Sequence, residues 1–358
     1  MATSTDNPTD AAAIVLPSDN LDASIGFFRD HLGFRLDMIF PADAPREAQM
    51  SGYGLTLHLD TACESSPETL SIRTSDPSLL AIESPAVSPD GLSISIESMD
   101  AGTLDVPVKP GIHIQSAASP KDWGVGRAGM QYRDLIPDRL GGAWIASHIR
   151  IPDGGPVPDY VHHHHVRFQI IFCRRGWVRV VYEDQGAPFV MHEGDCVLQP
   201  PHIRHRVLEC SDGFEVVEVG SPAEHQTLVD HEMTLPTKSV APARSFSGQT
   251  FVRHQAAEVA WGASEYAGLE MQQTGIGEAT NGIGDVRVLR PAGNAESVDL
   301  TANHTFLFRF VLDGSLTLES DEGASALEPG AAFVFPPDRR HGVRSLSADC
   351  RLLEVIGT

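Results

Sequence analysis

The strongest constraint on the fold is an internal repeat. Its first copy carries four landmarks in the order Gly176, Gly194, Pro200 and His205. Its second copy carries the same four residue types in the order Gly314, Gly330, Pro336 and His341. The offset is 138 residues at the first glycine and 136 at the other three, so a two-residue deletion separates the copies. Around the landmarks, short β-rich runs are broken by Gly and Pro roughly every eight to twelve residues, as in antiparallel sandwiches and barrels. The repeat therefore predicts two tandem β-barrels.

Composition limits the function classes that this chain can serve. Its 358 residues exceed one typical domain, and its net charge is −22 with a pI near 5.0. A surface this acidic repels phosphate backbones and anionic lipids. We therefore expect neither nucleic acid nor a membrane as a partner. We expect a small-molecule substrate instead.

Targeting and redox signals favour a cytoplasmic protein. The segment MATSTDNPTDAAAIVLP lacks the basic start and long apolar stretch of a signal peptide. No apolar run is long enough to span a membrane. The five cysteines are scattered and form no CxxC pair, which argues against a disulfide framework and against cysteine zinc fingers.

The N-terminal residues predict a small α+β module. Ala12–Leu16 forms a short apolar run, and Asn20 can cap a helix whose apolar face ends at Gly33. Three short strand-like stretches follow, at Phe34–Phe40, Met50–Tyr53 and Leu55–Leu59. The expected order is βαβββ.

This order, and the segment SDNLDASIGFFRDHLGFRL in particular, resembles one module of the glyoxalase/vicinal-oxygen-chelate family. That family places a metal-binding His on the first strand, where this chain has Ala12, and His58 stands alone on a later strand. We expect an accessory or dimerisation module without a metal site over residues 1–95. Residues 61–125 are rich in Ser, Pro, Asp and Gly with strand-like islands at Leu92–Ile96 and Ile112–Ile114, and we expect a loop-rich connector over 96–128.

The first repeat resembles the cupin superfamily at both of its signature motifs. In the first motif, Gly155 precedes the block His162-His163-His164-His165, and Gln169 and Gly176 follow. In the second motif, Gly194, Pro200 and His205 fit, while His202 stands where the family has its last glycine. The resemblance implies a double-stranded β-helix, or jelly-roll, barrel over 129–238 and a second one over 239–358. The expected fold class is mostly β, with two cupin barrels after the α+β module.

The residues themselves predict a metal site in the first barrel. Side chains two apart on a strand point the same way, so an HxH pair aims two imidazoles into the barrel. His205 adds a third nitrogen and Gln169 an amide oxygen. Imidazole suits Fe, Mn, Ni, Cu and Zn alike, so the ligand set does not select the metal. Gln169 replaces the more usual Glu, which leaves the site one negative charge poorer and without that general base.

Four consecutive histidines leave two registers open. With His162 and His164, four residues separate the pair from Gln169, as in germin-like cupins, and a bulge is needed. With His163 and His165 the spacing is three, and all three side chains keep one parity. The distance back to Gly155 favours His162 and His164.

The second barrel has lost most of this set. Leu307 stands where Gln169 stood, and Ala302 or Asn303 lie near the histidine positions. Only His341 survives, with His304 nearby but offset. We expect this barrel to be degenerate and structural.

A bicupin with one silent barrel resembles the ring-cleaving dioxygenases of the gentisate type. The resemblance implies one divalent metal ion per chain, with Fe(II) favoured, and a small oxygenated substrate, aromatic or diketone-like. Arg167 and Arg179 are candidate contacts for a substrate carboxylate. Two alternatives remain open: a lyase, isomerase or hydrolase that uses Zn, Mn or Ni, and a non-catalytic metal-binding or sensor protein. Cupins commonly pair through barrel faces, so a homodimer is expected.

Overall fold

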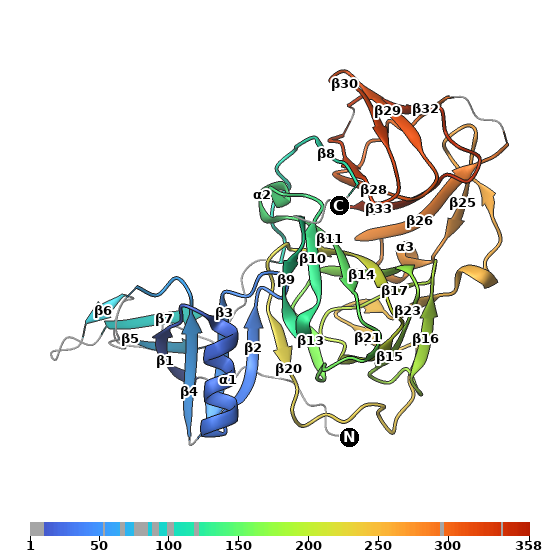
Figure 1. The fold of residues 1–358 in the computed structure, drawn as a ribbon. Coiled ribbons are helices and arrows are strands. Elements are labelled where there is room, and N and C mark those ends of the chain that lie inside the picture. Colours follow the sequence, from blue (N-terminus) through green and yellow to red (C-terminus); the bar gives the residue numbers. More distant parts are fainter. Residues whose placement is uncertain are drawn as a thin grey trace. The chain divides into compact units, whose positions relative to one another are not determined.

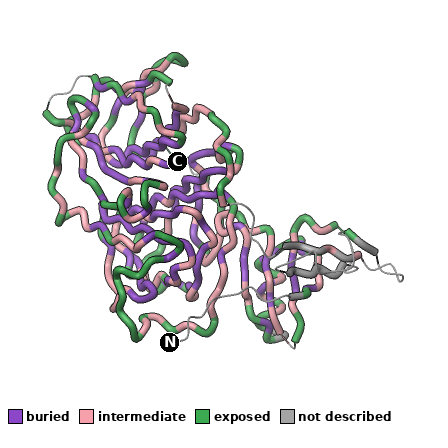
Figure 2. Tube along the Cα trace, turned by 180° about the vertical axis from the view of Figure 1, so that it is seen from behind, coloured by how far each residue is buried: buried purple, intermediate pink, exposed green. Residues whose placement is uncertain are grey.

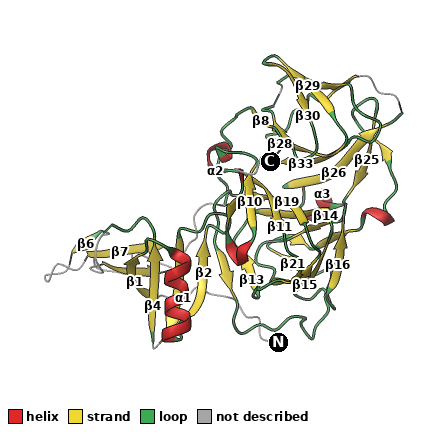
Figure 3. Cartoon of the chain, in the orientation of Figure 1, coloured by secondary structure: helices red, strands yellow, loops and turns green. Residues whose placement is uncertain are grey.

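A computed structural model describes residues 11–52, 54–64, 69–74, 85–87, 93–98, 104–117, 122–293, 297–337 and 339–358. The chain divides into two compact units. One comprises Met1–Leu104 with His225–His231, and the other comprises Asp105–Glu224 with Glu232–Thr358. Strands dominate the described residues (Figure 3), which confirms the predicted fold class. No helix in the described part of the chain is long and apolar enough to cross a membrane.

The N-terminal unit begins with the predicted order of elements. These are β1 (Ala11–Pro17), α1 (Leu21–Leu32), β2 (Arg35–Phe40), β3 (Glu47–Gly52) and β4 (Leu55–Asp60). Helix α1 starts and ends where its sequence predicts. The Asn20 side chain accepts a hydrogen bond from the Ala23 amide at 3.0 Å, and Gly33 ends the helix in the left-handed region at φ 72°. Leu21 and Ile25 bury one helix face in the core of this unit.

The sheet of this unit is larger than the sequence predicts. Its strand order is β20-β2-β3-β4-β1-β5-β7-β6, with β5 (Thr69–Thr74), β6 (Ala86–Val87), β7 (Ser93–Ser98) and β20 (Thr227–Val229) added. Strands β5 and β7 pair in parallel, although they lie in the interval that was expected to be loop-rich. The predicted strand-like island Leu92–Ile96 overlaps β7, and its first residue, Leu92, lies outside the described residues. Strand β20, from the segment expected in the first barrel, pairs with the backbone of β2 and belongs to this unit instead.

The first barrel consists of two facing sheets, drawn green to yellow in Figure 1. One sheet has the order β16-β15-β18-β13, and β12 also pairs with β18. Its strands are β12 (Gly155–Pro156), β13 (His162–His164), β15 (Trp177–Tyr182), β16 (Phe189–His192) and β18 (His205–Cys210). The other sheet has the order β23-β17-β14-β19-β11-β10-β9. Its strands are β9 (Gly124–Val125), β10 (Gln131–Asp134), β11 (Ile145–Ile151), β14 (Phe168–Arg175), β17 (Cys196–Leu198), β19 (Phe214–Ser221) and β23 (Val252–His254).

The second barrel repeats this arrangement. One sheet has the order β24-β25-β26-β33-β28-β31-β8, and the other has the order β27-β32-β29-β30. The first contains β8 (His113–Gln115), β24 (Gly262–Ala263), β25 (Leu269–Gln273), β26 (Gly284–Pro291), β28 (Phe306–Asp313), β31 (Ala332–Val334) and β33 (Arg351–Gly357). The second contains β27 (Ser297–Asp299), β29 (Leu316–Ser320), β30 (Gly323–Leu327) and β32 (His341–Arg344). Strand β8, from the expected connector, is thus part of the second barrel. Short elements complete the unit: α2 (Arg139–Gly142), α3 (Ile276–Ala279) and a hairpin of β21 (Ser245–Phe246) with β22 (Gln249–Thr250).

Alternation along the strands gives each barrel an inner and an outer apolar face. On β19, Val216 packs with Val178 and Val180 of β15 inside the first barrel. Its neighbours Val217 and Val219 face the other way, into a core that also contains Phe306 and Phe308 of the second barrel. Buried residues follow the strands of both barrels in Figure 2. Inside the first barrel lie the odd-numbered side chains of β14 and the even-numbered side chains of β19, and this alternation positions the candidate site.

Candidate metal centre

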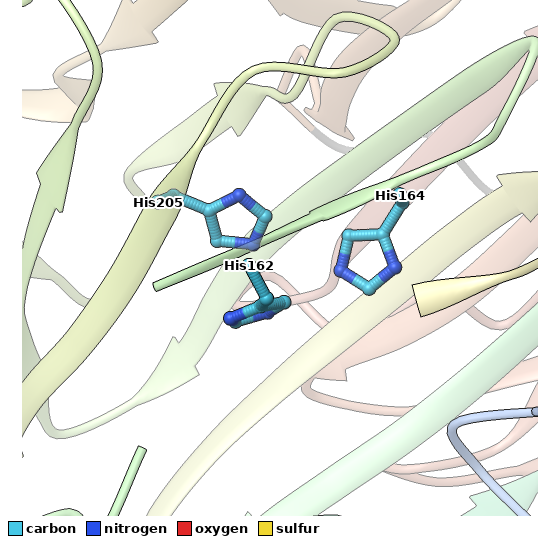
Figure 4. Close-up of side chains that lie close together, drawn as sticks. All are labelled: His162, His164 and His205. Atoms are coloured by element: carbon cyan, nitrogen blue, oxygen red, sulfur yellow. The ribbon is translucent and has the colours of Figure 1, made fainter. Parts of the chain in front are cut away.

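Three histidines converge inside the first barrel. Strands β13 and β18 are antiparallel, with His162 directly opposite His205. His164 lies two residues beyond His162, so its side chain points the same way. One ring nitrogen from each of His162, His164 and His205 lies within 4.8 Å of the others, and all three residues are buried. Figure 4 shows the three rings turned toward one another from the two strands.

The structure brings together the first of the two predicted registers. His163 and His165 project to the other side of the chain, where their ring centroids lie 5.5 and 5.0 Å from that of His202. The predicted bulge is absent. Instead, β13 ends at His164 and β14 begins at Phe168, so the intervening bend resets the parity before Gln169. His202 adopts φ 65°, the left-handed conformation for which the family motif has a glycine at this place.

Hydrogen bonds fix the tautomer of two of the rings. Nδ1 of His162 lies 2.8 Å from the Tyr160 carbonyl oxygen, and Nδ1 of His205 lies 3.0 Å from the Ile203 carbonyl oxygen. A carbonyl only accepts, so each Nδ1 carries the proton and each Nε2 keeps its lone pair. Burial lowers the pKa of His205 to about 4 and lowers the pKa of His162 well below its usual value. Both imidazoles are therefore neutral at neutral pH, as metal ligands must be.

A buried ion pair lies behind His162. Arg127 donates from Nη1 to Oδ1 of Asp159, and that oxygen lies 3.7 Å from Nδ1 of His162. The other Asp159 oxygen accepts from the Val207 amide of β18 at 2.9 Å. Burial alone would raise the pKa of Asp159, but the charge of Arg127, together with the hydrogen bond from the Val207 amide, lowers it to about 2. Asp159, just before β13, thus ties this segment to the backbone of β18.

Gln169 lies on the facing sheet with its side chain buried. Its Nε2 donates to Oε1 of Glu218 at 2.6 Å, and Glu218 is the inward neighbour of Val216 on β19. Oε1 of Gln169 has no hydrogen-bond partner among the described residues. From the sequence we expected no carboxylate at this place, because Gln169 replaces the usual Glu. The structure shows that Glu218 supplies a carboxylate beside Gln169.

Contacts place Gln169 at the same end of the barrel as the histidines. Its backbone oxygen accepts from the Gln199 amide at 2.9 Å, and the Gln199 side chain donates to the Tyr182 hydroxyl at 2.8 Å. The Tyr182 ring stacks near His205 with centroids 5.4 Å apart. Burial raises the pKa of the Tyr182 phenol, so this hydroxyl stays protonated at neutral pH.

The donor set fits a divalent transition-metal ion. Nε2 of His162 and Oε1 of Gln169 are buried acceptor atoms without a partner among the described residues, and an unpaired buried acceptor costs about 1–3 kcal/mol. Three imidazole nitrogens with an amide oxygen match Fe, Mn, Ni, Cu or Zn. His162, His164 and His205 would hold the ion, with Gln169 beside them.

The two candidate arginines lie elsewhere. Arg167 donates to the backbone oxygen of Thr358 at 2.6 Å, because the C-terminal strand ends beside the start of β14. Arg179 alternates with the inward residues Val178 and Val180, and it pairs with Glu209 at 3.0 Å on the outer face. Neither guanidinium therefore points into the barrel interior.

In the second barrel, an arginine guanidinium contacts His341, the counterpart of His205. Arg309 is fully buried, and its Nη1 donates to Nε2 of His341 at 2.7 Å. Its Nε donates to Glu354 at 2.5 Å, and Arg287 donates to the other oxygen of that carboxylate at 2.5 Å. Among the described residues no second cluster of metal-binding side chains occurs.

The N-terminal unit shows no metal cluster in its described residues either. His58 is buried and pairs with Glu47 at 3.0 Å across β3 and β4. All five cysteines lie in described segments and are free.

Sequence reasoning missed the groups around the ligands. They are Arg127, Asp159, Tyr182, Gln199 and Glu218. One signal could have revealed the last of them: Glu354 follows Glu218 at the same offset of 136 that relates the repeat landmarks, and both interrupt otherwise apolar strands.

Comparison with known proteins identifies a cupin domain within the chain. Residues 289–356 match the family model described as a cupin domain. The match lies in the second barrel, whereas the three histidines lie in the first. Both barrels pair their strands in the same order, and the match supports the predicted resemblance to the cupin superfamily.

Solved structures of two proteins resemble the chain. Protein Ylba from E. coli has a TM-score of 0.48 at 10% identity, over 71% of this chain and 93% of its own. Oxalate decarboxylase from Bacillus subtilis, which has Mn(II) centres, has a TM-score of 0.49 at 13% identity, over 72% of this chain and 79% of its own. Both scores are below 0.5, so no substrate or metal is carried over from either protein. No curated protein sequence matches the chain.

Proposed function

We propose that the first barrel is a metal-dependent enzyme of the cupin type that holds one Fe(II) ion per chain on His162, His164 and His205. It would act as a mononuclear dioxygenase on a small oxygenated substrate, aromatic or diketone-like. The observation that carries the proposal is the convergence of three buried histidine nitrogens within 4.8 Å. Bound there, Fe(II) would supply Lewis acidity and electrons for the reduction of dioxygen.

The chain's own residues suit such a substrate. The proposed ligands are imidazoles and an amide, which bring no negative charge, so the charge of a bound ion would favour an anionic, oxygen-rich molecule. Aromatic rings gather beside His205: Tyr182 lies 4.6 Å from Phe251 and 5.9 Å from Phe189 between ring centroids. Apolar walls with a few convergent polar groups are typical of small-molecule sites.

One observation favours a second candidate, a Zn-, Mn- or Ni-dependent lyase, isomerase or hydrolase. Such chemistry needs a group that accepts a proton, and Glu218 places a carboxylate in the interior, 2.6 Å from Gln169. Metal identity separates the two candidates.

For the N-terminal unit we propose an accessory role, similar to one glyoxalase-family module without its metal. Ala12 stands at the ligand position of its first strand, and His58 is engaged with Glu47.

The decisive experiment is metal analysis of untagged protein purified without oxygen, beside His205→Ala. His192→Ala, an exposed histidine of the same barrel, is the matched control. We expect about one Fe per chain in the wild type and in the control, lost in His205→Ala. Oxygen uptake with catechols, hydroxybenzoates and diketones would then be screened. Stoichiometric Zn, Mn or Ni would favour the second candidate, and no metal in any of the three proteins would overturn both.

A further inference from the structure

Glu218 and Gln169 form a buried amide–carboxylate pair inside the first barrel. They lie on adjacent strands of one sheet, β19 and β14, which pair in register with Ile171 opposite Glu218. The Gln169 side chain reaches across to Glu218, and its amide nitrogen lies 2.6 Å from Oε1 of that carboxylate. Gln169 is 1% exposed, so solvent does not compete for its amide.

This pair fixes which end of the Gln169 amide faces the interior. A carboxylate only accepts hydrogen bonds, so the NH2 group must be the end that meets Glu218. The amide oxygen is thereby turned away from Glu218, and it is buried without a hydrogen-bond partner among the described residues. An amide held in the opposite orientation would present N–H groups, which cannot ligate a metal.

We propose that Glu218 is a positioning residue that orients Gln169 so that its amide oxygen, rather than its nitrogen, faces the metal. This inference rests on the proposed metal at His162, His164 and His205. Glu218 acts through Gln169 and is not itself a ligand. Among the described residues, the group of side chains close enough to share an ion includes the three histidines and no carboxylate.

The second barrel uses the corresponding glutamate in the same way. Glu354 follows Glu218 at the repeat offset of 136, and its carboxylate holds the guanidinium of Arg309 at 2.5 Å. Arg309 in turn donates to His341, the counterpart of His205, at 2.7 Å. Each barrel thus has a glutamate at this place, on β19 and on β33, that bonds to an interior side chain, and in the second barrel that side chain reaches the histidine.

Co(II) binding tests the proposal without relying on activity. Metal-free protein would be titrated with Co(II), with the affinity and the visible absorption spectrum as readouts. We expect Glu218→Gln to weaken Co(II) binding about tenfold or more and to change the spectrum as Gln169→Leu does, because two amides no longer define one orientation. Glu209→Gln, the same substitution at a half-exposed position on β18, should leave both unchanged.

A reciprocal exchange separates orientation from simple loss of stability. In the double variant Gln169→Glu/Glu218→Gln, the amide of residue 218 would donate to the carboxylate at 169 and leave its second oxygen facing the ion. Co(II) affinity should return to at least the wild-type value. Glu218→Asp, which keeps the charge but retracts the carboxylate, should lose affinity as Glu218→Gln does, and it replaces that variant if the latter does not fold.

The outcomes separate a failure of the proposed metal centre from a failure of the proposed role of Glu218. If wild-type protein binds no Co(II), the proposed metal centre is overturned and this inference with it. If wild-type protein binds Co(II), His205→Ala does not, and Glu218→Gln matches Glu209→Gln in affinity and spectrum, the metal centre stands and the role of Glu218 is overturned.

Discussion

The same histidine meets different neighbours in the two barrels, and these neighbours decide its chemistry. His205 and His341 occupy equivalent landmarks, and both direct Nδ1 to a backbone carbonyl two residues earlier. His205 faces two further imidazoles, whereas Nε2 of His341 accepts from Arg309. A guanidinium therefore supplies in the second barrel the positive charge that a metal ion would supply in the first.

Removal of Arg309 should be costly. Its side chain donates to Glu354, His341, Tyr266 and the backbone of Leu300, all in the buried interior. Arg309→Met would leave the Glu354 carboxylate with Arg287 as its remaining cation, and breaking a buried ion pair costs about 3–5 kcal/mol. Urea unfolding would measure the loss. Arg344→Met breaks an exposed pair with Glu319 and should cost at most about 1 kcal/mol; equal losses in the two variants would contradict the prediction.

His341 should make stability depend on pH. Burial, followed by the charge of Arg309, lowers its pKa from 6.5 to about 4. The unfolded chain therefore takes up this proton first as the pH falls, and the free energy of unfolding declines from about pH 6.5 to about pH 4. The full contribution, present above pH 6.5, is about 3 kcal/mol. Urea unfolding at pH 7.0 and 5.0 should show a smaller difference in His341→Gln than in wild type; identical differences would exclude this residue as the cause.

At the scale of elements, the sequence predicted the features that are set by residues close together in the chain. Asn20 and Gly33 bound α1 as expected because each acts within one helical turn. The HxH spacing and His205 predicted a cluster because strand alternation fixes which side chains share a face. The break between β13 and β14 was not predictable, since it depends on the two strands joining different sheets.

Residues that lie near the site only because their strands pair could not be predicted from the sequence. Tyr182 meets His205 because β15 and β18 pair, and Glu218 meets Gln169 because β14 and β19 pair. Strands β5 and β20 were missed for the same reason: each is defined by the edge that it joins rather than by its own short sequence.

The cap of α1 provides a test at this scale. Asn20 accepts a hydrogen bond from the Ala23 amide at 3.0 Å, one of the donors that a helix start leaves unpaired. Asn20→Ala should destabilise the protein by about 1 kcal/mol, and Asn20→Gly by only a few tenths. Thermal unfolding would compare the two. An alanine variant as stable as the wild type would show that the cap contributes nothing.

At the scale of the whole molecule, the two barrels of the second unit share one apolar core. Trp144 stacks on Phe306 with parallel rings 4.0 Å apart, and Phe168 packs beside them. The outer faces of β14 and β19 thus meet the corresponding strands of the second barrel. A barrel without metal can still be required, because its core residues cover one side of the barrel that carries the histidines.

Gly357 tests how far the two barrels depend on each other. It lies at the end of β33, and a Cβ atom there would stand 2.2 Å from Cζ2 of Trp144, whose ring is stacked on Phe306. Gly357→Ala should therefore destabilise the protein by about 1–3 kcal/mol through overpacking. Gly262→Ala, where nothing lies within 4 Å of the added atom, is the control and should be nearly neutral.

The shared core predicts that this substitution also affects the unfolding of the first barrel. Unfolding of the Co(II)-loaded protein would be followed by tryptophan fluorescence and by the Co(II) absorption of the first barrel. If one core joins the barrels, Gly357→Ala shifts both midpoints to lower urea by the same amount, although the substitution lies in the second barrel. A shift in fluorescence with an unchanged Co(II) midpoint would mean that the first barrel holds its metal centre without help from the second.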